Sequence, residues 1–189
     1  MKKYNIAVFV GSLRKASYNL KTAHALIALA PESLSFDIIN IADIPMFNED
    51  LEATPPVEWI ALKEQISAAD GLLFLTPEYN RSVPAVLKNV IDVGSRPYGK
   101  NSWDGKPAAL VSVSIGNIGG FGANHHLRQS LVFLNVPTMA QPEAYIADAS
   151  GLFNGSGDLA NPSTKDFFKT FMSAFEKWVE ANVAEEYAH

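Results

Sequence analysis

The sequence contains no cysteine among its 189 residues. Disulfides, thiolate zinc sites, cysteine-ligated iron–sulfur clusters and cysteine nucleophiles are therefore excluded. With no thiol present, any redox chemistry must come from a bound cofactor.

Positive charge is also scarce. The chain has 15 Lys and Arg against 20 Asp and Glu, a formal net charge of −5, and no basic block of five or six residues. Nonspecific binding to nucleic acid or to an anionic membrane requires concentrated positive charge, so we expect neither as a partner.

Long apolar runs are missing as well. The weakly polar stretch 108–123 is interrupted by Ser112, Ser114 and several glycines, so it would span a bilayer poorly. Lys2 and Lys3 precede an apolar stretch that ends at Gly11 without a small-residue cleavage site, which is unlike a signal peptide. We therefore expect a cytoplasmic protein. Its size and 48% hydrophobic content fit one compact domain, residues 1–189.

Apolar and helical patterns alternate along the chain. Apolar, partly β-branched runs predict strands at 5–10, 36–41, 71–76, 108–114 and 138–146. Several of them lack polar alternation, which is typical of strands covered on both faces. Amphipathic patterns predict helices at 18–30, 57–69, 84–93, 120–134 and 164–185. This order predicts an α/β fold, a doubly wound five-stranded parallel sheet with helices on both faces.

Ligands of such sheets bind at the carboxyl ends of the strands, and the first loop there is GSLRKASYN, residues 11–19. It is neither a G-x-G-x-x-G motif nor a Walker loop. Ser12, Ser17 and Asn19 carry hydrogen-bond donors, Arg14 supplies a forked cation, and the next helix offers free N–H groups. This combination suits a single terminal phosphate. The alternative is a surface turn with an N-cap serine.

A second loop, TPEYNRSVP at residues 76–84, follows the third predicted strand. Its prolines stiffen it, Tyr79 offers a flat face, and Asn80 can read the edge of a heterocycle. A flat ring is needed because charge-assisted hydrogen bonds net about 1.5–3 kcal/mol each, whereas micromolar binding needs about 8 kcal/mol. The alternative is an ordinary proline-rich connection in which Glu78 and Arg81 are merely solvated.

With these two loops, the sequence resembles the NADPH-dependent FMN reductases, which include bacterial quinone and chromate reductases of flavodoxin-like fold. GSLRKASYN resembles the family's phosphate loop, and TPEYNRSVPAVLKNVID its flavin-ring loop and following helix. The resemblance continues through GKPAALVSVSIGNIGG and HLRQSLVFLNV to PEAYI, from residue 5 to residue 146. It implies a flavodoxin-like sheet of order 2-1-3-4-5, FMN as cofactor, and NADPH or NADH as co-substrate.

The resemblance also implies which residues bind the cofactor. Phosphate contacts are expected from Ser12, Arg14, Ser17 and Asn19, with main-chain contributions around Lys15 and Tyr18. Isoalloxazine contacts are expected from Pro77, Glu78, Tyr79 and Asn80, with Ser114 and Gly116 closing the site. Lys15, Arg81 and Arg96 are candidates to meet the 2′-phosphate of NADPH, and spacing does not rank them.

The implied enzyme passes electrons from NAD(P)H through FMN, in ping-pong order, to quinones, flavins, azo compounds or chromate-like oxyanions. No catalytic side chain is required, because the chemistry takes place at flavin N5. The alternative is a flavodoxin-like electron carrier with a protein partner, although such carriers tend to be more acidic than this chain.

The resemblance extends to assembly. Relatives dimerise through the helix after the third strand and some form tetramers, so a homodimer or homotetramer is expected. Some relatives have an arginine and a tyrosine here, in a contact between dimers, where this chain has FGANH at residues 121–125. The resemblance therefore does not extend to a tetramer contact of that kind.

We expect no metal. His125 and His126 are adjacent, so on a helix they diverge by about 100° and do not face one ion. Residues 148–162 are rich in turn formers and predict a mobile loop, but their acidic residues lack the spacing of an EF-hand.

Overall fold

A computed structural model describes residues 2–183. Five parallel strands form one sheet in the order β2-β1-β3-β4-β5, which confirms the predicted flavodoxin-like topology. The strands are β1 (Tyr4–Val10), β2 (Leu34–Ile38), β3 (Gly71–Thr76), β4 (Ala108–Val113) and β5 (Ala144–Ile146).

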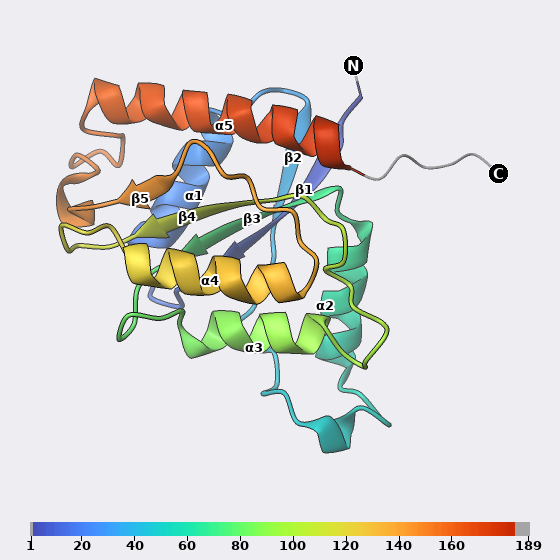
Figure 1. The fold of residues 1–189 in the computed structure, drawn as a ribbon. Coiled ribbons are helices and arrows are strands. Elements are labelled where there is room, and N and C mark those ends of the chain that lie inside the picture. The colour runs from blue at the N-terminus through green and yellow to red at the C-terminus, as the bar shows by residue number, and fades with distance from the viewer. Residues whose placement is uncertain (1, 184–189) are drawn as a thin grey trace.

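Helices cover both faces of the sheet (Figure 1). One face carries α1 (Tyr18–Ala28) and α5 (Pro162–Asn182). The other carries α2 (Val57–Ala68), α3 (Ala85–Gly94) and α4 (Phe121–Phe133). Two short 3-10 helices, η1 (Glu49–Leu51) and η2 (Ala149–Gly151), lie in connections.

The strands lack polar alternation because both of their faces are buried. In β1, Ile6, Val8 and Val10 pack into the core beneath α1 and α5, whereas Ala7 and Phe9 pack into the core beneath α2, α3 and α4. Successive side chains of a strand point to opposite faces, so each strand contributes to both cores.

Two strands depart from their predicted bounds by more than one residue. The second occupies 34–38 rather than 36–41, because after Ile39 the chain turns and the Asn40 side chain accepts a hydrogen bond from the amide of Ala42. The fifth occupies 144–146 rather than 138–146. Pro142, which has no amide hydrogen to donate to a ladder, lies in the connection before it.

Two further predictions concern the C-terminal part of the chain. The last helix begins at Pro162, capped by Asn161, and residues 184 and 185 of its predicted range lie outside the described residues. The turn-rich segment 148–162 holds η2 and a turn in which the Asn154 side chain accepts hydrogen bonds from the amides of Ser156 and Asp158. Its mobility stays a prediction.

None of the helices within residues 2–183 combines the length and the apolar character that crossing a bilayer requires.

Candidate functional site

Three loops begin together at the carboxyl edge of the sheet. Val10 of β1 pairs with Leu75 of β3, and Thr76 pairs with Ser112 of β4. The amide of Gly11 donates to the Leu75 carbonyl at 2.8 Å, which carries this pairing into the first loop. Because β2 and β3 flank β1 on opposite sides, the strand order reverses between β1 and β3. Such a reversal creates the crevice in which these sheets bind ligands.

Ser17 is the N-cap of α1, and its side-chain oxygen accepts a hydrogen bond from the Leu20 amide at 3.1 Å. The N-cap interpretation is therefore correct for this serine. Its hydroxyl hydrogen is not used by this bond, but the residue is only 2% exposed, so its predicted phosphate contact stays a prediction. The amides of Tyr18 and Asn19 lie in the first turn, where an α-helix supplies no acceptor.

Two cations lie just before this helix. Arg14 and Lys15 are exposed, and within residues 2–183 neither has a carboxylate oxygen within 4.0 Å. Ser12 is half-buried beside them. Two uncompensated cations, hydroxyl groups and the positive end of a helix dipole form a donor set that fits a terminal phosphate.

Asn19 has a second role that the sequence did not indicate. Its side chain is buried and its Nδ2 donates to the Val113 carbonyl at 3.4 Å, which connects α1 to the end of β4. Its Oδ1 has no hydrogen-bond partner among the described residues. The phosphate contact of Asn19 stays a prediction; because its Nδ2 is engaged, the donor left for such a contact is its backbone amide.

The second loop forms a tight turn at residues 79–82. Tyr79 and Ser82 exchange backbone hydrogen bonds of 2.9 and 3.0 Å, and Asn80 and Arg81 adopt φ angles of 51° and 64°. This left-handed region costs an ordinary L-residue about 1–2 kcal/mol, although asparagine tolerates it better. The turn leaves Tyr79 51% exposed at the loop surface.

Glu78 is not solvated, contrary to the proline-rich-connection alternative. Its carboxylate accepts hydrogen bonds from the Ala123 amide at 3.1 Å and from Arg81 Nη1 at 2.6 Å. Gly122 makes this approach possible, because a Cβ there would lie 2.9 Å from Glu78 Oε2. The carboxylate therefore ties the second loop to the start of α4. Because both of its oxygens are engaged there, only the main chain and Cβ of Glu78 are left for the predicted contact with a flat ring.

Glu78→Ala is expected to lower the free energy of unfolding by about 1–3 kcal/mol, because it leaves a helix-terminal amide without its charged acceptor. Glu78→Gln should cost less, since its carbonyl oxygen still accepts from Ala123. Urea unfolding measures both. Glu180→Ala removes an exposed carboxylate from α5 and is the control. A loss in Glu78→Ala no larger than in this control would contradict the anchoring role.

The third loop follows β4. Ser114 donates its amide to the Ile146 carbonyl at 2.9 Å, and its Oγ accepts from the exposed Gly116 at 3.1 Å. Ser112 Oγ donates to the Gly119 carbonyl at 2.6 Å. These bonds hold residues 114–119 against the ends of β4 and β5.

Large apolar side chains are exposed on these loops and at the start of α4: Leu13, Tyr79, Ile115, Ile118 and Phe121. The sequence-based prediction included only Tyr79. The signal for the others was an apolar residue placed within a polar loop. Exposed apolar side chains at one edge are typical of a binding surface, and here they suit the faces of a flat ring.

An aromatic cluster borders the third loop. The Tyr145 hydroxyl donates its single hydrogen to Glu143 at 2.8 Å, so at the 2.9 Å contact His125 Nε2 must be the donor. The Phe121 ring packs on His125 with centroids 4.2 Å apart. His126 instead contacts Ser82 Oγ through Nδ1 at 3.0 Å. The two histidines thus diverge as predicted.

Burial, followed by the hydrogen bond to Glu143, raises the pKa of Tyr145 from 10.0 to about 12. The unfolded chain therefore loses this proton at a lower pH than the folded protein. Stability should fall between pH 10 and pH 12, because in that window the folded state holds more protons than the unfolded state. Unfolding measured across this range should show a smaller fall in Tyr145→Phe, and an identical fall would contradict the assignment.

Arg96 is unsuited to the predicted 2′-phosphate contact. It lies beyond α3, a 10-residue helix about 15 Å long, which begins next to the second loop. Its guanidinium is engaged by Glu52 at 2.6 Å and by Glu49 at 3.0 Å. Lys15 and Arg81 remain as candidates. No group of three His, Asp or Glu side chains suited to a metal ion occurs within residues 2–183.

Comparison with known proteins identifies the family. The family model described as NADPH-dependent FMN reductase matches residues 4–151. The chain belongs to this family. The predicted fold, enzyme class and cofactors are thereby confirmed, and the donor set of the first loop suits the phosphate of FMN.

Relatives of this FMN reductase align over almost its whole length. It is 57% identical over 182 residues to a quinone reductase of Pseudomonas putida, covering 96% of this chain and 97% of that protein. It is 44% identical over 174 residues to a 2-hydroxy-1,4-benzoquinone reductase of a Burkholderia species, covering 92% and 95%. Among solved structures, FerB, a flavoenzyme NAD(P)H:(acceptor) oxidoreductase from Paracoccus denitrificans, is 41% identical with a TM-score of 0.91, covering 96% of this chain and 100% of that chain.

Proposed function

We propose that this FMN reductase uses NAD(P)H to reduce quinones at a single site formed by the loops after β1, β3 and β4. The observation that carries the proposal is the meeting of a phosphate-type donor set and exposed apolar side chains at one edge, joined by the Gly11–Leu75 hydrogen bond. Its similarity to two quinone reductases, at 57% and 44% identity, supports a quinone as the acceptor.

Each loop has a task. Arg14, Lys15 and the amides of Tyr18 and Asn19 hold the phosphate of FMN, while Leu13, Tyr79 and Ile115 shield the flat ring from water. In this site, bound FMN would supply the hydride and electron-pair transfer between NAD(P)H and the acceptor. The balance is NAD(P)H plus quinone plus one proton, giving NAD(P)⁺ and hydroquinone. No side chain of these loops is assigned a proton transfer.

The two half-reactions follow ping-pong order, because both partners approach the same exposed edge. That openness also suits flavins, azo compounds and chromate-like oxyanions as further acceptors.

We place the enzyme in the cytoplasm as a homodimer or homotetramer. Val132 and Phe133, exposed at 70% and 86% near the end of α4, support burial against a second copy.

Anaerobic titration tests the proposal. Protein reconstituted with FMN should retain it stoichiometrically, NADH or NADPH should bleach its flavin absorbance, and benzoquinone should restore the absorbance. Initial rates should give parallel double-reciprocal lines. Protein that retains no FMN, or holds FMN that neither nucleotide bleaches, would contradict the proposal. The second result would favour the electron-carrier alternative.

A further inference from the structure

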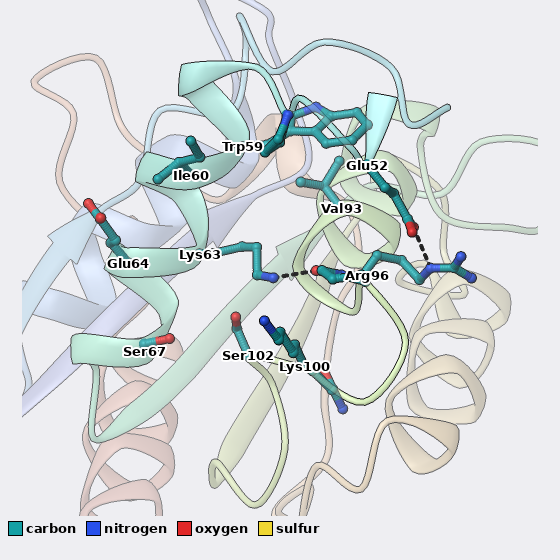
Figure 2. Close-up of a pocket in the computed structure, with 13 residues that line it drawn as sticks. Glu52, Trp59, Ile60, Lys63, Glu64, Ser67, Val93, Arg96, Lys100 and Ser102 are labelled. Atoms are coloured by element: carbon teal, nitrogen blue, oxygen red, sulfur yellow. Dashed lines mark hydrogen bonds and ion pairs between the residues drawn. The ribbon is translucent and has the colours of Figure 1, made fainter. Parts of the chain in front are cut away.

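A second concave region lies away from the three loops. A cavity of about 500 Å³ lies between α2 and the chain that connects α3 to β4 (Figure 2). That connection enters the sheet at the amino end of β4, whereas the three loops leave the carboxyl ends of their strands. Sites for small organic ligands typically measure about 300–1,000 Å³, so the cavity has a suitable size.

One side of the cavity is cationic. Lys63 of α2 and Lys100 of the connection approach each other together with Ser102 (Figure 2). The Lys63 ammonium donates to the Arg96 carbonyl, and within residues 2–183 neither lysine has a carboxylate oxygen within 4.0 Å. Two like charges therefore face each other, and neither is in a salt bridge.

The environment of Lys63 reflects this arrangement. Burial, and secondly the neighbouring Lys100 charge, lower the pKa of Lys63 below its ordinary value, while Glu52 acts in the opposite direction. An anion placed between the two ammonium groups would remove the repulsion between them.

The other charged groups at the cavity do not take this role. Arg96 is paired with both Glu49 and Glu52, a group with a net charge of −1, so its guanidinium is not available to an anion. The carboxylate of Glu64 also borders the cavity, but Figure 2 shows it directed away from Lys63.

The opposite side of the cavity is apolar. Trp59 and Ile60 of α2 and Val93 of α3 line this side, and Pro55 and Pro97 also line the cavity. Trp59 is held in place, since its Nε1 donates to the Pro45 carbonyl at 2.8 Å and its ring stacks on Phe47. A ligand that fits both sides carries an anionic group and a flat or apolar body.

We propose that this cavity is a second ligand site that binds an organic phosphate with a flat apolar body. Two ammonium groups match the dianionic charge, and the hydroxyls of Ser67 and Ser102 supply further donors for the phosphate oxygens. The body of the ligand packs against Trp59 and Ile60. None of the lining residues belongs to the three loops, so the site stands independently of the proposed function.

Isothermal titration of FMN-loaded, desalted protein with phenyl phosphate tests this site. We expect saturable binding that Lys63→Gln and Lys100→Gln each weaken about tenfold or more, as the loss of a charge-assisted bond predicts. Lys169→Gln removes an exposed α5 lysine and is the matched control, with unchanged affinity. Inorganic phosphate and phenol should each bind more weakly than phenyl phosphate.

Lys100→Gln is the decisive variant, because Lys63 also supports the backbone at Arg96. Absence of saturable binding, wild-type affinity in Lys100→Gln, or equal affinity for phenol would overturn the proposal. Titration of FMN-loaded and FMN-free wild-type protein separates this site from the first loop: equal phenyl phosphate affinity supports the cavity, and saturable binding to the FMN-free protein alone would mean that the probe occupies the loop instead.

Discussion

Arg14→Ala is expected to weaken FMN binding by about 10- to 100-fold and to leave riboflavin binding unchanged. The guanidinium is exposed in the first loop and has no carboxylate partner among the described residues, so its charge is available to the phosphate. A charge-assisted hydrogen bond of about 1.5–3 kcal/mol accounts for the loss. Riboflavin carries the same ring without the phosphate. Quenching of flavin fluorescence by the apoprotein measures both affinities.

Two results would argue against this role. Unchanged FMN affinity would mean that the phosphate lies elsewhere, and an equal loss for riboflavin would mean that Arg14 supports the loop or the ring. Lys169→Ala removes a cation from the exposed side of α5 and should change neither affinity. Unchanged far-ultraviolet circular dichroism establishes that Arg14→Ala leaves the fold intact.

The central strands were predictable because their burial is extreme. Every residue of β3 and β4 is buried, so their apolar runs have sharp ends in the sequence. β5 was predicted too long because its ladder with β4 covers only three residues. Before it, Thr138 makes only an isolated parallel bridge to Ala108, and the chain between that bridge and β5 leaves the ladder. At a sheet edge, apolar character and strand pairing separate, and sequence pattern reports only the former.

The candidate site was predictable where polar residues follow a strand directly. Arg14 and Ser17 stand out against the apolar strand before them, and strand order brings their loop beside the second one. The anchoring of Glu78 was not predictable, because its partner is a backbone amide at Ala123 that any residue type supplies. The hydrogen bond of Asn19 was not predictable for the same reason, because its acceptor is the backbone carbonyl of Val113, which is distant in the sequence.

The cavity beside α2 could not be predicted from the sequence, for a related reason. Lys63 and Lys100 are isolated lysines in the sequence, and each alone has the pattern of a solvated surface charge. Only the packing of the α3–β4 connection against α2 brings them together. Two like charges placed side by side by tertiary structure therefore indicate a ligand site, and the sequence alone does not show this proximity.

Trp103→Ala is expected to lower the free energy of unfolding by about 3–5 kcal/mol, the usual cost of removing a large buried aromatic side chain. The indole is 0% exposed, and its ring centroid lies 5.2 Å from that of Phe9 and 5.8 Å from that of Phe74. Its Nε1 donates to the Ile91 carbonyl at 3.0 Å. Tyr98→Ala alters a 91% exposed ring in the same connection and is the control, with a change within about 0.5 kcal/mol.

Gly94→Ala tests the same packing from the opposite direction. A Cβ at Gly94 would lie 2.4–2.8 Å from three atoms of the Trp103 indole, so overpacking should cost about 1–3 kcal/mol or more. In the Trp103→Ala background that cost should vanish, because the space left by the indole accommodates the methyl group and alanine favours the helix by about 0.5–1 kcal/mol over glycine. Urea unfolding of the two single variants and the double variant measures this coupling. Additive losses would show that the indole does not pack against Gly94. The packing of Trp103 against Phe9 of β1 and Phe74 of β3 would then also have to differ from the one described.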